Sequence, residues 1–314
     1  MSVDEAATHG SIIYAKDSSI LQVVGVPSPP NLIPAIPKYV PCRKGPWKRP
    51  SGRYCRVIDF YGPLGVKNAI ARAGMDERLD PFYSSAMPYI HRNEILRIIE
   101  PREAMENLVA SARFHYYISL IEKISRESSV STENLGITGS VAAGIAVHGL
   151  SDLDIVVYGI YNAAKMFEYF KSRLSKVRPL IVKRNHGGVK SSPIDIRWRR
   201  QQFNNSMLVS WIGVGSSHEK CTPLKSYWSI ESPDLRRIVK MTLYIKPWQE
   251  TALIYPPCVY TNKGVHVVSF EYNIGTLLYQ GGKILIEGIP SISNNTIYLG
   301  LREFPGGVYR IQAL

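Results

Sequence analysis

Residues 136–158 of this chain read GITGSVAAGIAVHGLSDLDIVVY. The pattern predicts a strand over Leu135–Thr138, a tight turn at Gly139-Ser140 and a helix of small residues over Val141–Val147. A second strand follows, and its run Ile155–Val157 is apolar enough to be buried. This strand–helix–strand unit is the strongest local signal in the chain, and the functional predictions start from it.

Two carboxylates lie at the start of the second strand. Alternate residues of a strand share a face, so Asp152 and Asp154 point the same way while Leu153 points into the core. Two like charges side by side repel each other unless a cation lies between them. Carboxylate oxygens suit Mg²⁺ or Mn²⁺, which usually carry a phosphorylated substrate. We therefore predict that Asp152 and Asp154 are metal ligands.

The turn before the helix supplies a complementary feature. Backbone N–H groups at the start of a helix are unpaired and attract anions. Gly139 lets a phosphate approach the backbone, and the Ser140 hydroxyl can donate a hydrogen bond to a phosphate oxygen. The unit is therefore expected to bring a phosphate site and metal-binding carboxylates together.

Gly139-Ser140, eleven further residues and then Asp152-Leu153-Asp154 resemble the signature of the polymerase-β-like nucleotidyltransferase superfamily. This resemblance covers roughly residues 105–200, and the run SDLDIVVYG also looks like a group of predicted nucleotidyltransferases from archaea. It implies that Gly139, Ser140 and Ser151 bind the nucleotide. It further implies a third acid on a later neighbouring strand and two Mg²⁺ (or Mn²⁺) ions held among three carboxylates.

Asp195 is our candidate for the third acid. It lies in PIDIRW (193–198), where apolar residues flank the carboxylate as they do in a sheet strand with one acid on the metal face. We expect this strand to complete the sheet. The alternative is a surface aspartate that pairs with Arg197 or Arg199.

The resemblance implies a Mg²⁺-dependent nucleotidyltransferase that moves a nucleoside monophosphate from a nucleoside triphosphate to an acceptor hydroxyl. Asp152, Asp154 and Asp195 would be its catalytic and metal-binding residues, and Asp195 would activate the acceptor. Two alternatives stay open. One is a catalytically silent nucleic-acid-binding protein with the same fold, and the other is a nucleotidyltransferase that modifies proteins or small molecules.

The charge distribution favours a polyanionic acceptor. The net charge is +13, and two stretches, Ser18–Arg56 and Tyr169–Ile194, contain no acidic residue. Within the first stretch, CRKGPWKRPSGRYCR (42–56) holds six Lys or Arg. A solvated basic face would explain either stretch alone. Together, beside a predicted metal and phosphate site, they point to RNA or DNA.

The composition and the cysteines indicate the cellular compartment in which the protein is expected. No apolar run approaches the length of a membrane span, and the first residues lack the features of a signal peptide, so a cytoplasmic protein is expected. The four cysteines are scattered without a C-x-x-C pair: Cys42, Cys55, Cys221 and Cys258. A zinc site or a Cys42–Cys55 disulfide stays open, but we expect reduced thiols.

The predicted fold class is α+β, in three parts. Residues 1–100 would hold a β-hairpin, a proline-rich extended strap and short helices at 64–74 and 92–99. Residues 101–224 would form the catalytic domain, a mixed sheet with helices on one side, entered by one long helix from Pro101. Residues 225–314 would form an antiparallel barrel or sandwich. Its strands are expected at 239–245, 251–254, 265–270, 276–279, 284–287 and 296–301.

Overall fold

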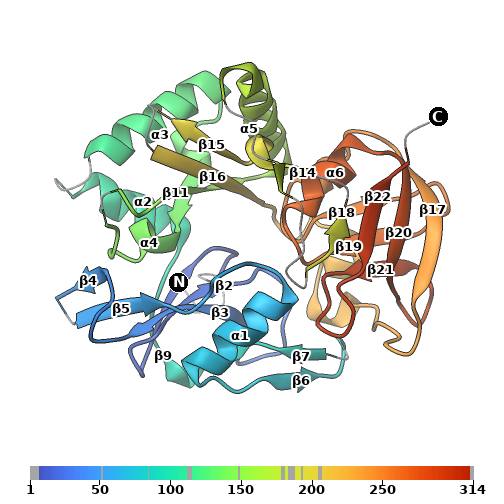
Figure 1. Cartoon of the computed structure of the whole chain (residues 1–314), viewed down its shortest axis with the longest axis horizontal. Coiled ribbons are helices and arrows are strands. Elements are labelled where there is room, and N and C mark those ends of the chain that lie inside the picture. Colours follow the sequence, from blue (N-terminus) through green and yellow to red (C-terminus); the bar gives the residue numbers. More distant parts are fainter. Residues whose placement is uncertain are drawn as a thin grey trace.

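The computed structural model describes residues 7–50, 52–83, 85–111, 115–147, 149–177, 181–182, 188–191, 194–203 and 207–311, with the backbone alone at 181–182 and 194–195. Its elements form three lobes around a common centre (Figure 1). Helices combine with mixed and antiparallel sheets, which confirms the mixed class expected from the sequence.

The N-terminal lobe is a sheet with the strand order β4-β5-β3-β2-β1-β9, to which β8 adds by pairing with β3. Its strands are β1 (Ile12–Ala15), β2 (Ile20–Val23), β3 (Leu32–Pro41), β4 (Trp47–Arg49), β5 (Gly52–Arg56), β8 (Tyr89–His91) and β9 (Ile95–Ile99). The hairpin β1–β2 confirms the prediction for this region, and Ser18 takes the left-handed conformation in its turn at φ 68°.

The proline-rich segment is not a separate extended strap, as expected from the sequence, but a central strand of the sheet. It forms β3, which pairs with β2, β5 and β8. A proline lacks only the N–H donor, and its carbonyl still accepts. The carbonyl of Pro34 accepts from the N–H of Val24 at 2.8 Å. Pro37 lies opposite a register shift at Ile20/Leu21, where the ladder is interrupted in any case.

Helix α1 (Pro63–Ala73) confirms the helix predicted near 64–74. Proline at its first turn and Gly74 at φ 64° after its end match the residue preferences of helix termini. The helix predicted over 92–99 is wrong. Only a 3-10 turn, η1 (Arg92–Glu94), forms there, because the apolar run that follows becomes β9 and pairs with β1. Between α1 and β8, β6 (Arg78–Asp80) and β7 (Ser85–Met87) make a small hairpin.

The middle lobe contains a mixed four-stranded sheet in the order β10-β11-β16-β15. Its elements are α2 (Pro101–Val109), α3 (His115–Ser128), β10 (Leu135–Thr138), α4 (Gly139–Ala142), β11 (Leu153–Tyr158), α5 (Ile160–Ser172), β15 (Arg200–Phe203) and β16 (Met207–Val214). Helices α3 and α5 lie on the same side of the sheet (Figure 1), as expected. The long helix predicted from Pro101 is instead two helices, α2 and α3.

β11 lies between β10 and β16. Strand β16 was not predicted from the sequence. It runs parallel to β11, with Ser210 opposite Asp154. The strand of Asp195, β14 (Ile194–Asp195), pairs with β12 (Ile181–Val182) in a separate two-stranded sheet, so the expectation that it completes the main sheet is wrong. Eight residues with alternating buried side chains give β16 a longer ladder than β14, which the 3-10 turn η5 (Ile196–Trp198) cuts short.

The C-terminal lobe is a seven-stranded sheet in the order β13-β22-β20-β21-β19-β18, with β17 also pairing with β20. Its strands are β13 (Lys190–Ser191), β17 (Val239–Ile245), β18 (Cys258–Tyr260), β19 (His266–Ser269), β20 (Gly282–Pro290), β21 (Thr296–Leu299) and β22 (Gly307–Arg310). The pairs β13–β22 and β19–β21 are parallel, so the sheet is mixed and not antiparallel throughout. Through β13, a segment before residue 225 takes part in this sheet.

Two of the predicted C-terminal strands are helical. Residues 251–254 fall partly in the 3-10 turn η8 (Glu250–Ala252), and residues 276–279 lie in α6 (Ile274–Gln280). Residues 274–279 are all buried, and a short apolar run that is buried on every side carries no periodicity to separate strand from helix. Further 3-10 turns lie at η3 (Thr132–Asn134), η4 (Leu174–Lys176), η6 (Thr222–Leu224) and η7 (Tyr227–Ser229).

All four cysteines form disulfides, so the expectation of reduced thiols is wrong. Cys42 bonds to Cys55 across the loop that contains β4, and Cys221 bonds to Cys258 of β18. The Cα atoms lie 5.7 Å and 6.2 Å apart, within the range that a disulfide spans. In the described part of the chain, no helix is both long enough and apolar enough to cross a membrane.

Contacts between lobes involve buried polar groups. The hydroxyl of Thr138, at the end of β10, donates to the carbonyl of Gly10 at 2.5 Å. His9 stacks on Tyr255 of the C-terminal lobe with ring centroids 4.1 Å apart, and its Nδ1 accepts from the N–H of Gly25. Burial lowers the pKa of His9 to about 3, with smaller effects of the same sign from Lys220 and Lys38.

This buried histidine predicts a loss of stability in mild acid. The folded state holds His9 neutral while the unfolded chain takes up a proton below about pH 6.5, so stability is present above that pH and falls as pH drops towards 3. Between about pH 7 and pH 5, His9 should remove about 2 kcal/mol from the free energy of unfolding. Urea titrations of wild type and His9→Gln, which keeps an acceptor, measure this difference. An equal acid loss in both proteins would contradict the prediction.

Candidate functional site

A cavity of about 590 Å³ opens where the three lobes meet. The N-terminal lobe contributes Lys38 and Arg56 to its lining, and the middle lobe contributes Asp152 and Asp154. The C-terminal lobe adds further side chains, among them Tyr272 and Arg302. A volume of this order accommodates a ligand of nucleotide size. The carboxylates singled out in the sequence therefore face a space that all three lobes build.

Asp152 directly precedes β11, Asp154 is its second residue, and both line the cavity. The guanidinium of Arg200, on the edge strand β15, pairs with Asp152 at 2.5 Å between Nη2 and Oδ2. The hydroxyl of Ser210, on β16, donates to Oδ1 of Asp154. Asp152 is thus held by a side chain of the edge strand, and Asp154 by a side chain of the strand next to β11.

The electrostatics of the pair match the crowding of two like charges. Burial raises the pKa of Asp152, the Arg200 guanidinium lowers it, and the nearby Asp154 raises it again. Arg200 therefore offsets part of the negative charge, but the two carboxylates still disfavour each other. A divalent cation at this position would offset the repulsion between the two carboxylates and the cost of burying their charge.

Gly139 lies directly against the carboxylate of Asp154. It takes φ 69°, and a Cβ atom added there would lie 2.4 Å from Oδ2 of Asp154. Glycine is needed on both counts, because other residues pay a steric penalty at positive φ and would displace the carboxylate. Helix α4 covers only four residues from Gly139, so the helix predicted over Val141–Val147 is wrong.

The two predicted serines lie in structural contacts. Ser140 is buried at 6% exposure, and its side chain has a small lowering effect on the pKa of Tyr39. Ser151 accepts a hydrogen bond from the N–H of Val147 at 2.9 Å, which closes the turn before β11. A role for either hydroxyl in nucleotide binding stays a prediction.

Three cavity residues were not singled out from the sequence: Lys38, Tyr39 and Ser210. Burial raises the pKa of Tyr39 to about 12, with a smaller lowering effect from Arg56 and a smaller raising effect from Asp154. Its phenol therefore keeps its proton at neutral pH. Lys38 is only 5% exposed and has its Nζ 4.3 Å from the ring centroid of Tyr61. The apolar residues interleaved with the prolines of β3 were the signal for this strand.

Asp195 is placed by its backbone alone. β14 is not hydrogen bonded to the sheet of β10 and β11, and the side chain of Asp195 falls outside the described atoms. Its role as the third acid stays a prediction. The residue that faces Asp154 from the neighbouring strand is Ser210, whose hydroxyl is an oxygen donor without charge.

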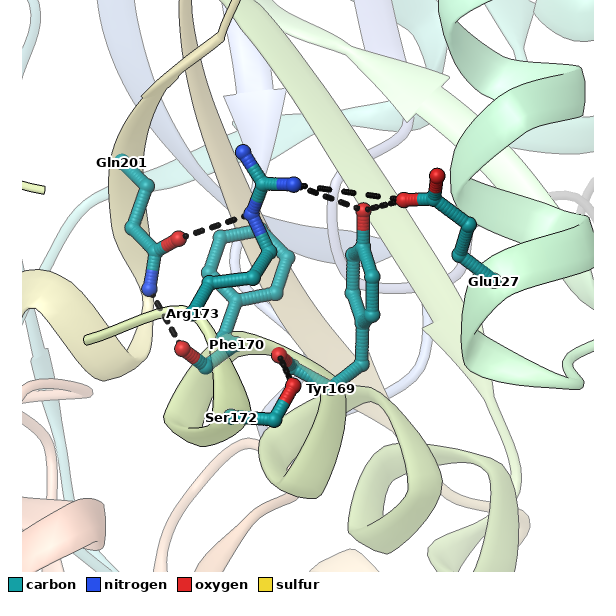
Figure 2. Close-up of polar contacts among 6 residues, drawn as sticks. All are labelled: Glu127, Tyr169, Phe170, Ser172, Arg173 and Gln201. Carbon is teal, nitrogen blue, oxygen red and sulfur yellow. Dashed lines mark hydrogen bonds and ion pairs between the residues drawn. The ribbon is translucent and has the colours of Figure 1, made fainter. Parts of the chain in front are cut away.

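A polar network behind the sheet holds β15, and with it Arg200, in position (Figure 2). The side-chain amide of Gln201 donates to the carbonyl of Phe170 at 2.6 Å and accepts from Arg173 at 3.3 Å. Tyr169 of α5 donates to Glu127 of α3 at 2.6 Å. These contacts tie α3, α5 and β15 together. Because they fix Gln201, they fix the adjacent Arg200 that pairs with Asp152.

The donor set fits a hard cation with substrate ligands. No cluster of three or more acidic, histidine or cysteine side chains suited to a metal occurs among the residues whose side chains are described. Mg²⁺ is commonly held by one or two carboxylates together with substrate phosphates and water. Asp152 and Asp154 therefore suffice for one such ion. A second ion requires the third acid, for which Asp195 is the candidate.

The first basic stretch forms an exposed hairpin beside the site. Strands β4 and β5 pair, and the Cys42–Cys55 disulfide fixes the base of the hairpin. Its exposed cations are Arg43, Lys44, Lys48, Arg53 and Arg56. Arg56 also lines the cavity, so the basic surface reaches the carboxylate site. The second stretch, Tyr169–Ile194, lies largely outside the described residues.

Comparison with known proteins gives no family to which the chain can be assigned, because no family model, no curated protein and no solved structure matches it. The function has to be inferred from the site itself. Its chemical content is a carboxylate pair, a glycine turn against one carboxylate, and basic side chains from two lobes, all around one cavity.

Proposed function

We propose that the chain is a Mg²⁺-dependent nucleotidyltransferase that transfers a nucleoside monophosphate from a nucleoside triphosphate to an acceptor hydroxyl. One observation carries the proposal: Asp152 and Asp154, two residues apart at the start of β11, line one nucleotide-sized cavity, with Gly139 in contact with Asp154. Sequence and geometry agree on these residues, which supports the resemblance to the polymerase-β-like superfamily.

Asp152 and Asp154 would hold the Mg²⁺ or Mn²⁺ ion. When bound, the cation supplies Lewis-acid stabilisation of charge on the phosphate oxygens. Arg200 orients Asp152, and the Ser210 hydroxyl orients Asp154. Asp195 as third ligand and as the base that takes the acceptor proton remains part of the proposal.

The N-terminal lobe would bind the triphosphate from the opposite side of the cavity. Lys38 and Arg56 supply positive charge, and Tyr39 supplies a phenol that stays protonated at neutral pH. Fixed donors of this kind bind phosphate oxygens and stabilise the charge that develops on them during transfer.

A nucleic-acid acceptor is supported by the basic hairpin β4–β5. Its exposed cations continue to the cavity through Arg56, so a bound strand would bring a terminal hydroxyl to the carboxylates. Phosphate contacts of this type give affinity without sequence choice and weaken steeply with salt. We therefore propose RNA or DNA as the acceptor class.

Substitution of Gly139 by alanine tests the geometry around Asp154. The positive φ should destabilise the fold by about 1–2 kcal/mol. The added Cβ would also displace the carboxylate of Asp154, and a displacement of about 1 Å can cost about 10²-fold in rate. Gly144, at φ 61° with open space around its Cβ position, is the matched control. Gly144→Ala should lose stability and keep its rate, whereas equal rates in both variants would contradict the role of Gly139.

The proposed activity is tested with each α-labelled nucleoside triphosphate and Mg²⁺, offered with total tRNA, short DNA and the protein itself as acceptors. The Asp152→Ala/Asp154→Ala protein serves as the inactive control. Label in RNA or DNA with wild type alone is the expected result. Label in the protein alone would show that the acceptor is protein and not nucleic acid. No transfer, with equal nucleic-acid binding by both proteins, would overturn the enzyme in favour of a silent binding protein.

A further inference from the structure

Arg199 is a buried cation at the junction of the middle and C-terminal lobes. It is 3% exposed and directly precedes β15. Its neighbour Arg200 pairs with Asp152, whereas the Arg199 side chain packs against the rings of Tyr272 and Trp211. Arg199 also lines the central cavity.

The guanidinium of Arg199 has no anionic partner among the described residues. Its three nitrogens, Nε, Nη1 and Nη2, are buried without a hydrogen bond. Burial lowers the pKa of Arg199, and no carboxylate acts against this effect. A buried guanidinium without hydrogen bonds is costly, and proteins normally pair such a group.

The surroundings hold the guanidinium in one orientation. Its Cζ lies 3.2 Å from the ring centroid of Tyr272 and 5.2 Å from that of Trp211. The Tyr272 hydroxyl accepts from the N–H of Gly213 and donates to the carbonyl of Leu253, so the ring itself is fixed. A Cβ at Gly275 would lie 2.8 Å from Nη2 of Arg199, so a larger residue at this position would clash with the guanidinium.

These features describe a preorganised site for an oxyanion. A guanidinium presents several N–H donors in a rigid planar fork that matches phosphate. Stacking on Tyr272 fixes the plane of the fork and leaves its edge for hydrogen bonds. Arg199 lines the cavity, so a ligand that occupies the cavity lies beside this residue.

We propose that Arg199 binds a phosphate group of a ligand in the central cavity, on a platform formed by Tyr272 of the C-terminal lobe. This gives the C-terminal lobe a part in ligand binding. The proposal does not depend on nucleotidyl transfer, because phosphate binding at Arg199 requires neither the metal nor a reaction.

The test measures the melting temperature of the whole chain with EDTA present, as inorganic phosphate replaces chloride at constant ionic strength. A ligand that binds only the folded state raises the melting temperature in proportion to its occupancy. Wild type should melt higher in phosphate. Acetate in the same series shows whether a carboxylate serves equally well, and stabilisation by acetate alone would overturn the phosphate assignment.

Arg199→Met separates a binding role from a structural one. Removal of an unpaired buried charge should leave the melting temperature in chloride unchanged or higher, and should abolish the phosphate effect. Arg302, which lines the same cavity but pairs with Glu77, is the matched control. Arg302→Met should melt lower in chloride and keep the phosphate effect.

Arg199→Lys keeps the proposal testable if the methionine variant does not fold. It retains the charge without the fork, so the phosphate dissociation constant should rise by about tenfold. A phosphate effect of wild-type size in either Arg199 variant would overturn the proposal. So would the absence of any phosphate effect in wild type. Neither result would bear on the transfer assay, which is scored separately.

Discussion

Asp154→Asn is expected to lower the rate of nucleotidyl transfer by at least about 10³-fold and to leave the fold intact. A divalent cation supplies several kcal/mol of charge stabilisation, and each 1.4 kcal/mol corresponds to about tenfold in rate. The amide keeps an oxygen that can accept from Ser210, so the local hydrogen bond survives. Loss of one of two crowded carboxylates should leave the free energy of unfolding equal or higher.

Transfer of labelled nucleotide and urea unfolding, measured on the same preparations, check both parts of this expectation. Asp59→Asn is the control, because Asp59 lines the same cavity but pairs with Arg72. It should keep its rate within a few fold. Asp195→Asn, measured in parallel, decides the third acid, since a loss as large as that of Asp154→Asn would support its assignment. An active Asp154→Asn enzyme would exclude the proposed site.

Removal of the Cys221–Cys258 disulfide, in Cys221→Ala/Cys258→Ala, is expected to lower the free energy of unfolding by about 4 kcal/mol. The bond joins residues 37 positions apart, so it restricts the unfolded chain over a long loop. It also anchors the segment before β17 to β18, where Cys258 is 1% exposed. The loss should therefore appear as a lower urea midpoint.

The Cys42–Cys55 disulfide serves as the comparison, because its separation is only 13 residues. Cys42→Ala/Cys55→Ala should cost less, about 3 kcal/mol by the same loop-length argument. A reductant should lower the stability of wild type by about the sum and leave a variant without any of the four cysteines unchanged. Equal urea midpoints for wild type with and without reductant would show that the bonds do not contribute.

The parts of the structure that the sequence predicted well are those with a local cause. The common direction predicted for Asp152 and Asp154 rests on strand periodicity, and both residues line one cavity. The hairpin β1–β2 and helix α1 carry their turn and end residues within the segment itself. Where a local signal was ambiguous, as in the buried run of α6, the prediction was wrong.

Tertiary structure alone determined the partners of these local elements. Strand β16, and not the strand of Asp195, pairs with β11, and this pairing places Ser210 opposite Asp154. The prolines of β3 fit a central strand because the carbonyl of Pro34 still accepts from Val24 and Pro37 lies opposite a register shift. Sequence spacing contains no information on which distant strand competes best for a place beside β11.

The sequence by itself determined the strand–turn–strand unit with its glycine and two carboxylates, because each depends on residues a few positions apart. Only the tertiary structure decided what surrounds them. Lys38 comes from the N-terminal lobe and the adjacent Arg199 and Arg200 from the start of β15 in the middle lobe, and both disulfides join cysteines that we expected to be reduced. Charge pairing and burial depend on three-dimensional proximity, which long-range packing sets, so these features could be recognised only once the lobes were assembled.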